Sequence, residues 1–242
     1  AQKRYAEALA DFDRALQLDS KLNWVVASRG ETYRLMERYE EALGDFNRVI
    51  ELDPKYAWAI ASRGHVYRAQ KRYAEALADF DRALQLDPKL NWAVAARGST
   101  YRALERYEVA LGDFNRAIQN DPKYAWAIAQ RGETYRLTKR HNEALGDYYR
   151  ALQLDPKLNW VVASRGSAYR ALERYEEALG DFNRAIQSDP KYAWAIANRG
   201  QLYQAQKRYA EALADFDRAL QLDPKLNWVV ALRDQTLRAM GR

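Results

Sequence analysis

Apolar side chains recur along this chain in a pattern with a period of 34 residues. Within positions 57–90, Trp58, Ile60, Ala61 and Gly64 lie at the spacing of one helical face. A second apolar stripe follows in the same repeat: Tyr73, Ala76, Leu77, Phe80, Ala83, Leu84 and Leu86. The two stripes predict two amphipathic helices, over roughly 57–70 and 74–86.

The second stripe ends at Asp87-Pro88, a pair that recurs in every full repeat. Proline cannot continue a helix, and Asp followed by Pro suits the first two positions of a type I turn. Each repeat is therefore predicted to hold two antiparallel helices, and a tight turn leads into the next repeat. We call them the first and the second helix.

Fixed self-similarity of this kind indicates one array of stacked supersecondary units, which here spans residues 1–242. A half repeat, 1–22, holds only a second helix, and 227–242 holds only a first helix. Six full repeats lie between them: 23–56, 57–90, 91–124, 125–158, 159–192 and 193–226. Because the chain begins inside a second helix and without Met, we expect Ala1 to be an internal boundary of a longer protein.

Glycine returns once in every full repeat, at the position of Gly64 in the first helix. A glycine inside a helix costs about 1 kcal/mol relative to alanine, so its recurrence needs a packing reason. Ala76 and Phe80 lie at matching positions of the second helix. We therefore expect the two helices to approach closely at the glycine, with the phenylalanine filling the space beside it.

The repeat resembles the tetratricopeptide repeat, whose 34-residue signature includes Gly, Tyr, Ala, Phe and Pro at fixed offsets. Five residues match that signature: Gly64, Tyr67, Ala76, Phe80 and Pro88. The resemblance implies an all-α fold, a right-handed α-solenoid superhelix of antiparallel helix pairs. It also implies that the first helices line the concave wall and that the partner varies between family members.

Three positions depart from the family pattern. Ile60 stands where the family usually has a large aromatic residue, and Trp58 lies two residues earlier. Arg63 replaces an expected leucine, and Lys71 occupies the turn between the helices, where glycine or asparagine is common.

The Arg63 position is arginine in every repeat, and the second helix carries an equally regular aspartate column. A buried arginine needs a partner, and its planar guanidinium binds a carboxylate through two bonds. The columns predict a ladder of structural ion pairs built from Arg63, Arg97, Arg131 and Arg165 with Asp79, Asp113 and Asp147. The alternative is a column of arginines that binds a ligand.

First-helix positions vary on this constant framework, notably in the columns of Ser62 and His65. Variation beside constant tryptophan and arginine columns favours a recognition surface, since Trp and Arg are enriched in binding hot spots. The candidate concave-face residues are Trp58, Trp92, Trp126, Trp160, Trp194, Arg68, Arg102, Arg136, Arg170, His65, Ser99, Glu133, Ser167 and Gln130. The alternatives are drift at solvent positions and tryptophans that pack between adjacent first helices.

Composition narrows the chemistry. The chain has no cysteine, which excludes disulfides, thiol catalysis and cysteine-based metal sites. Its two histidines, His65 and His141, lie in different repeats. We expect no catalytic residues, cofactor or metal, and therefore no enzymatic activity. No apolar run reaches the roughly 18 residues of a membrane span, and no signal peptide is visible, so cytoplasmic placement is the default expectation.

The leading hypothesis is a non-catalytic scaffold that binds a protein or peptide segment on its concave face, as the recognition or sensor part of a larger protein. A structural alternative is head-to-tail self-association through the apolar faces of the two terminal half repeats. Those faces include Leu9, Phe12 and Leu16 at one end and Val230 and Leu237 at the other, with Asp234 as a candidate cap. Nucleic-acid binding is a third reading, although the net charge of +6 includes no basic run.

Overall fold

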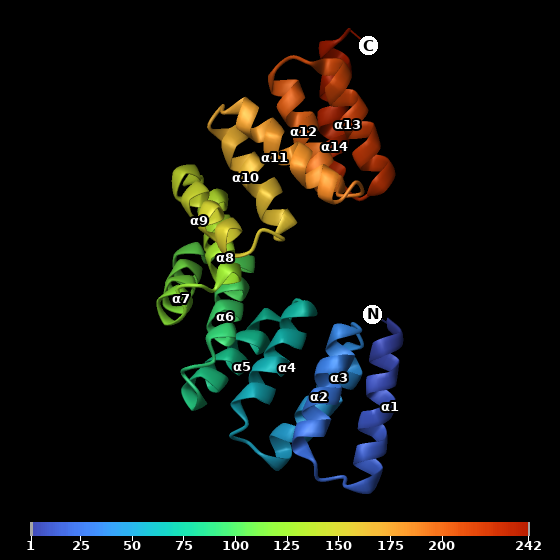
Figure 1. The fold of residues 1–242 in the computed structure, drawn as a ribbon, viewed down its shortest axis with the longest axis vertical. Coiled ribbons are helices and arrows are strands. Elements are labelled where there is room, and N and C mark those ends of the chain that lie inside the picture. Colours follow the sequence, from blue (N-terminus) through green and yellow to red (C-terminus); the bar gives the residue numbers. More distant parts are fainter. Residues whose placement is uncertain (1, 242) are drawn as a thin grey trace. The chain divides into compact units, whose positions relative to one another are not determined.

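The computed structural model describes residues 2–241, and over that range it contains fourteen α-helices and no strand (Figure 1). The second helices, together with the leading half repeat, are α1 (Gln2–Leu18), α3 (Tyr39–Leu52), α5 (Tyr73–Leu86), α7 (Tyr107–Asn120), α9 (His141–Leu154), α11 (Tyr175–Ser188) and α13 (Tyr209–Leu222). The first helices are α2 (Asn23–Leu35), α4 (Ala57–Ala69), α6 (Asn91–Ala103), α8 (Ala125–Leu137), α10 (Asn159–Ala171), α12 (Ala193–Ala205) and α14 (Asn227–Ala239). None of the described helices is long and apolar enough to cross a membrane.

The chain divides into two compact units, which meet in sequence between Pro122 and Lys123. In the N-terminal unit, α2, α4 and α6 each pack against the following second helix, and successive pairs stack on one another. The C-terminal unit repeats this arrangement from α8 to α13, with α14 packed on α13. Each unit is an α-solenoid of antiparallel helix pairs, which confirms the predicted fold class.

The turn between first and second helix has a left-handed residue in all six full repeats: Glu37, Lys71, Glu105, Lys139, Glu173 and Lys207. At Lys71 φ is 61°, the conformation in which the family usually places glycine or asparagine. The backbone N–H of Arg72 donates to the Tyr67 carbonyl at 2.8 Å. The Arg72 guanidinium also lies 4.4 Å from the Tyr67 ring centroid. These contacts stabilise a turn that a long charged residue adopts at a cost of about 1 kcal/mol.

In each full repeat the glycine of the first helix lies against an aromatic ring of the second helix, which is Tyr148 for Gly132 and phenylalanine for the others. A Cβ on Gly166 would stand 3.0 Å from Cε1 of the fully buried Phe182 ring and 3.2 Å from Cβ of Asp181. By contrast, a Cβ on Gly180, in the second helix of the same repeat, would meet nothing within 4 Å. Close helix approach therefore explains the first glycine but not the second.

These two glycines give a matched stability test. We expect Gly166→Ala to lower the free energy of unfolding by about 1–2 kcal/mol, because overpacking against a buried ring outweighs the gain in helix propensity. Gly180→Ala should raise it by about 0.5–1 kcal/mol, since only the propensity changes. Urea unfolding followed by circular dichroism measures both, and equal effects of the two substitutions would contradict the packing explanation.

Candidate ligand-binding face of the first helices

Paired arginine and aspartate side chains fix the first helices in place. Nε and Nη2 of Arg97 lie 2.9 and 2.6 Å from the two carboxylate oxygens of Asp113, on the second helix of the same repeat. Nη1 of Arg97 lies 2.6 Å from Asp81, on the preceding second helix. The bond to Asp113 raises the pKa of Arg97. One arginine thus ties three helices together, α5, α6 and α7.

The same bidentate pairing recurs through both units, in the columns that the sequence singled out. The pairs are Arg29–Asp45, Arg63–Asp79, Arg97–Asp113, Arg131–Asp147, Arg165–Asp181 and Arg199–Asp215. Each aspartate in these pairs is buried. The geometry gives Arg63, Arg97, Arg131 and Arg165 a structural partner, which favours the ion-pair interpretation over a ligand-binding one.

Sequence reasoning missed the acceptor on the preceding second helix. That position is Asp13 for Arg29, Asn47 for Arg63 and Asn183 for Arg199, each 2.7–2.8 Å from the arginine Nη1. The available signal was a column that alternates between aspartate and asparagine, two residues with an acceptor oxygen. Tyr149 replaces that acceptor for Arg165, whose guanidinium lies 4.7 Å from the tyrosine ring centroid.

Two of the candidate tryptophans line a cavity of about 300 Å³ in the N-terminal unit, together with residues of α2 and α4. The lining residues are Glu31, Arg34, Trp58, Ser62, His65 and Trp92. The Trp92 ring stacks on His65, with centroids 5.3 Å apart and an interplanar angle of 29°. Trp58 meets the edge of Phe46 with centroids 6.2 Å apart. The cavity therefore presents aromatic faces beside a charged pair.

All five candidate tryptophans are half-buried: Trp58, Trp92, Trp126, Trp160 and Trp194. Each therefore packs against the framework with part of its ring and leaves part of it accessible. The first and last tryptophans of this column are more exposed, Trp24 at 61% and Trp228 at 37%. The two readings of this column, packing and accessibility, describe different parts of one side chain.

Burial corrects the expectation for part of the variable surface. Ser99 and Ser167, predicted to face a ligand, are only 4% and 5% exposed. Ser167 Oγ lies 3.1 Å from Oδ1 of Asn198, on the next first helix, and Asn198 is itself buried. These positions vary because adjacent first helices pack against each other there, so they do not form an open recognition surface. Gln130, which belongs to the column of Ser62, is half-buried.

Residues at this contact are matched in size across neighbouring first helices. In most of these pairs a larger residue on one helix corresponds to a smaller one 31 positions later, or the reverse, as in Glu31 with Ser62, His65 with Ala96, Glu133 with Ser164 and Ser167 with Asn198. Gln201 with Leu232 departs from this pattern, since both residues are large. Close packing requires such compensation, because interiors tolerate neither voids nor added methylenes.

The candidate arginine column divides into two kinds. Arg34 and Arg136 each hold a glutamate three residues earlier, Glu31 and Glu133, with N–O distances of 2.6–2.9 Å. Glu133 also accepts a 2.7 Å bond from the hydroxyl of buried Tyr148. These arginines are neutralised within their own helix.

Arg68 and Arg170 lack such an acid, because His65 and Ser167 stand three residues before them. Nε of each is buried without a hydrogen-bond partner. Burial lowers the pKa of Arg68, and the charges of Arg102 and Arg34 lower it further. Arg102 is half-buried, and Ser99 stands three residues before it.

A second cavity, of about 410 Å³, lies in the C-terminal unit and was not predicted. Its lining comes from α10, α12, α13 and α14 and consists of Arg170, Gln201, Gln204, Ala205, Tyr209, Leu232, Gln235 and Ala239. Among these lining residues there is a guanidinium, three amides and a phenol but no carboxylate. Glutamines carry no motif in the sequence, so only their convergence in the fold identifies them.

Family models described as tetratricopeptide repeat match residues 27–56, 57–90, 95–159 and 193–226, and one described as TPR repeat matches 166–207. Comparison with curated proteins gave no match.

Solved structures similar to this chain are also repeat proteins. The APC/C hetero-tetramer Cut9–Hcn1 aligns with a TM-score of 0.89 at 16% identity over 96% of this chain, which spans 46% of the matched one. A tetratricopeptide repeat protein from Parabacteroides merdae aligns with a TM-score of 0.74 at 18% identity, covering 98% of this chain and 93% of that one. YrrB, described as a TPR protein with an unusual peptide-binding site, aligns with a TM-score of 0.59 at 23% identity, covering 78% and 97%. At these identities the likeness concerns the fold.

His65 predicts a pH dependence of stability. Burial, and after it the charges of Arg68 and Arg34, lower the pKa of His65 to about 3. In the unfolded chain the imidazole takes up a proton at its ordinary pKa of about 6.5. The free energy of unfolding therefore falls as the pH drops from about 6.5 toward about 3. We expect His65→Ser to remove up to about 2 kcal/mol of the difference in unfolding free energy between about pH 7 and about pH 5. Urea titrations at both pH values test this, and an unchanged difference would contradict a neutral, half-buried imidazole.

Proposed function

Because the chain belongs to the tetratricopeptide repeat family, we propose that it is a non-catalytic scaffold whose first helices bind a segment of another protein. Repeats of this family support protein-interaction scaffolds in general. The observation that carries the finer proposal is the N-terminal cavity, where Trp58, Trp92 and His65 stand beside the Glu31–Arg34 pair.

The chemistry of this cavity suits a peptide. Half-buried aromatic rings offer apolar area on a rigid base, and Trp and Arg are the residue types most enriched in hot spots. The stacked His65 and Trp92 rings are held by α4 and α6, whose arginines Arg63 and Arg97 are bonded to second helices. A surface that is already ordered loses less entropy when it binds.

The size and the relatives of the chain support a recognition role within a larger protein. The chain corresponds to less than half of the Cut9–Hcn1 chain that it matches. YrrB, a protein of the same fold, carries a peptide-binding site according to its description. We therefore place the peptide segment along α2, α4 and α6, the helices that line the cavity.

The two alternatives fit the geometry less well. Head-to-tail association would place a second helix on α14 in the manner of the other repeats. In α14, Asp234 stands at the position where the other first helices have glycine. Its Cβ would come about 3 Å from the phenylalanine of the incoming second helix, as a Cβ on Gly166 would from Phe182, and this close contact disfavours the association. Nucleic-acid binding would need free cationic side chains, whereas the invariant first-helix arginines are bonded to buried aspartates.

Peptides selected by display against the intact chain provide the test. We expect Trp92→Leu to weaken the affinity of a selected peptide by about tenfold or more, because a cavity-lining ring is lost. Trp24→Leu is the matched control, since Trp24 belongs to the same column but does not line the cavity. Titration calorimetry, with circular dichroism to verify folding, measures the effect. Equal losses in both variants, or a ligand footprint confined to the second helices, would contradict the proposal.

A further inference from the structure

The cavity in the C-terminal unit has the composition of an anion site. Figure 1 shows α12, α13 and α14 grouped near the C-terminus, and α10 adjoins α12. The cavity of about 410 Å³ between these helices holds Arg170 as the one charged residue of its lining. The amides of Gln201 and Gln235 and the phenol of Tyr209 are polar groups of the same lining.

Arg170 is the unusual member of this group. Its Nε is buried and lacks a hydrogen-bond partner. Burial lowers its pKa, and the neighbouring positive charge of Arg136 lowers it further. A partly buried guanidinium whose Nε has no hydrogen-bond partner is costly unless another group compensates its charge, and the protein supplies no acid in this lining.

The other repeats show what the site lacks. Arg136 stands in the same column and holds Glu133 through two bonds of 2.6 and 2.9 Å. At Arg170 the equivalent position is Ser167, whose hydroxyl is engaged with Asn198 instead. The carboxylate that neutralises Arg136 therefore has no counterpart three residues before Arg170.

We propose that this cavity binds an oxyanion, a carboxylate or a phosphate group, through the guanidinium of Arg170. Both groups match the planar, two-bond geometry of arginine, and amide N–H groups complete their coordination. The oxyanion is carried by the protein segment that the array binds, and this assignment rests on the proposed function. Gln204 does not take part, since its amide nitrogen donates to Thr236 Oγ1 at 3.0 Å.

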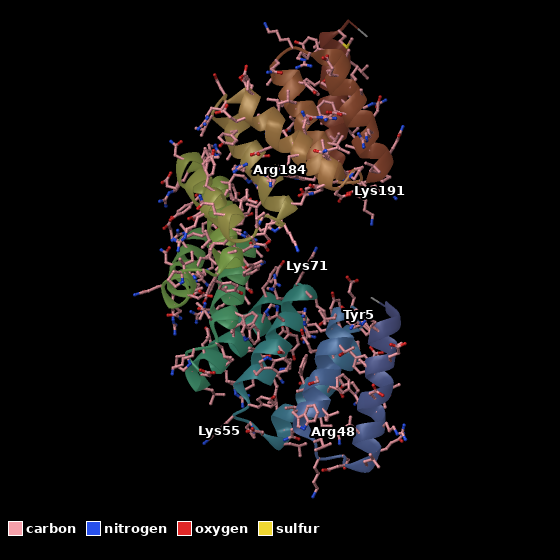
Figure 2. The ribbon with its side chains drawn as sticks, in the orientation of Figure 1. Tyr5, Arg48, Lys55, Lys71, Arg184 and Lys191 are labelled. Atoms are coloured by element: carbon pink, nitrogen blue, oxygen red, sulfur yellow. The ribbon has the colours of Figure 1, made fainter. Side chains whose placement is uncertain are left out.

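Two variants are designed to remove the site, and circular dichroism verifies that each keeps the fold. Arg170→Gln replaces the cation with the residue that the same column carries at Gln204. The double variant Ser167→Glu with Asn198→Ser copies the Glu133 and Ser164 arrangement and so supplies an internal carboxylate to Arg170. Lys191→Gln is the charge-matched control, because Lys191 is exposed in the turn between α11 and α12 (Figure 2).

Nitrogen-15 spectra of the arginine Nε groups report on the site directly in the intact chain. The probes are inorganic phosphate, acetyl-phosphoserine-amide and acetyl-glutamate-amide, at constant ionic strength. We expect a saturable shift of the Arg170 Nε–H signal, an affinity about tenfold or more lower in the double variant, and no change for Lys191→Gln. Calorimetry gives the same comparison for Arg170→Gln. The thermal midpoint of Arg170→Gln should be unchanged or higher, because a part-buried cation with an unpartnered Nε is removed.

The arms separate the ligand sources. Preference for the phosphoserine or for the glutamate probe identifies the group that the segment carries. A linear, non-saturating response, or equal affinity in wild type, the double variant and Arg170→Gln, overturns the site. Tighter binding of a thymidine oligonucleotide than of either amino-acid probe overturns its assignment to a protein segment. Because these probes are not selected peptides, the site can bind them even if the N-terminal cavity binds no peptide, so the two proposals fail separately.

Discussion

The bidentate bond between a first-helix arginine and a second-helix aspartate holds the two layers of this solenoid in register. It occupies a position where the family usually has leucine, so the chain has exchanged an apolar contact for a directional one. Arg97 makes three bonds, two to Asp113 and one to Asp81, and so joins neighbouring repeats as well as the helices of its own. In a repeat protein, where stability is a sum of nearest-neighbour terms, a bond to the preceding repeat strengthens the term between the two repeats. Arg29, Arg63, Arg97 and Arg199 each make such a bond.

This framework explains why the first helices can vary without losing their place. The backbone is held from the second-helix side by the arginine–aspartate pair and by close packing at the glycine, as at Gly166 against Phe182. On the other side, adjacent first helices contact each other through residues of complementary size, such as Ser167 and Asn198. A substitution in one column therefore constrains the residue in the neighbouring column, and it decides whether the nearby arginine has an acidic partner. On the same backbone, Arg136 is neutralised by Glu133, whereas the Nε of Arg170 has no partner.

Much of the fold could be predicted because its signals are local and repeated. The 34-residue period and the recurring proline and glycine predicted the helix pairs. The matched arginine and aspartate columns predicted the ion pairs between the two helices. Exposure was harder, since it depends on what the next helix places opposite: Ser99 and Ser167 are variable yet buried. The C-terminal cavity was out of reach for the same reason, because Gln201 and Gln235 lie one repeat apart and meet Arg170 only in the fold.

A double-mutant cycle on Arg97 and Asp113 tests the central role of the ion pair most directly. The variants are Arg97→Leu, which restores the residue usual in the family, Asp113→Ala and their combination, each unfolded in urea. We expect Asp113→Ala alone to lower the free energy of unfolding by about 3 kcal/mol, because it leaves the part-buried guanidinium of Arg97 without its main partner. We also expect a coupling energy of about 2 kcal/mol or more between the two sites. Additive effects, with a coupling energy below about 0.5 kcal/mol, would show that the pair does not hold the layers together.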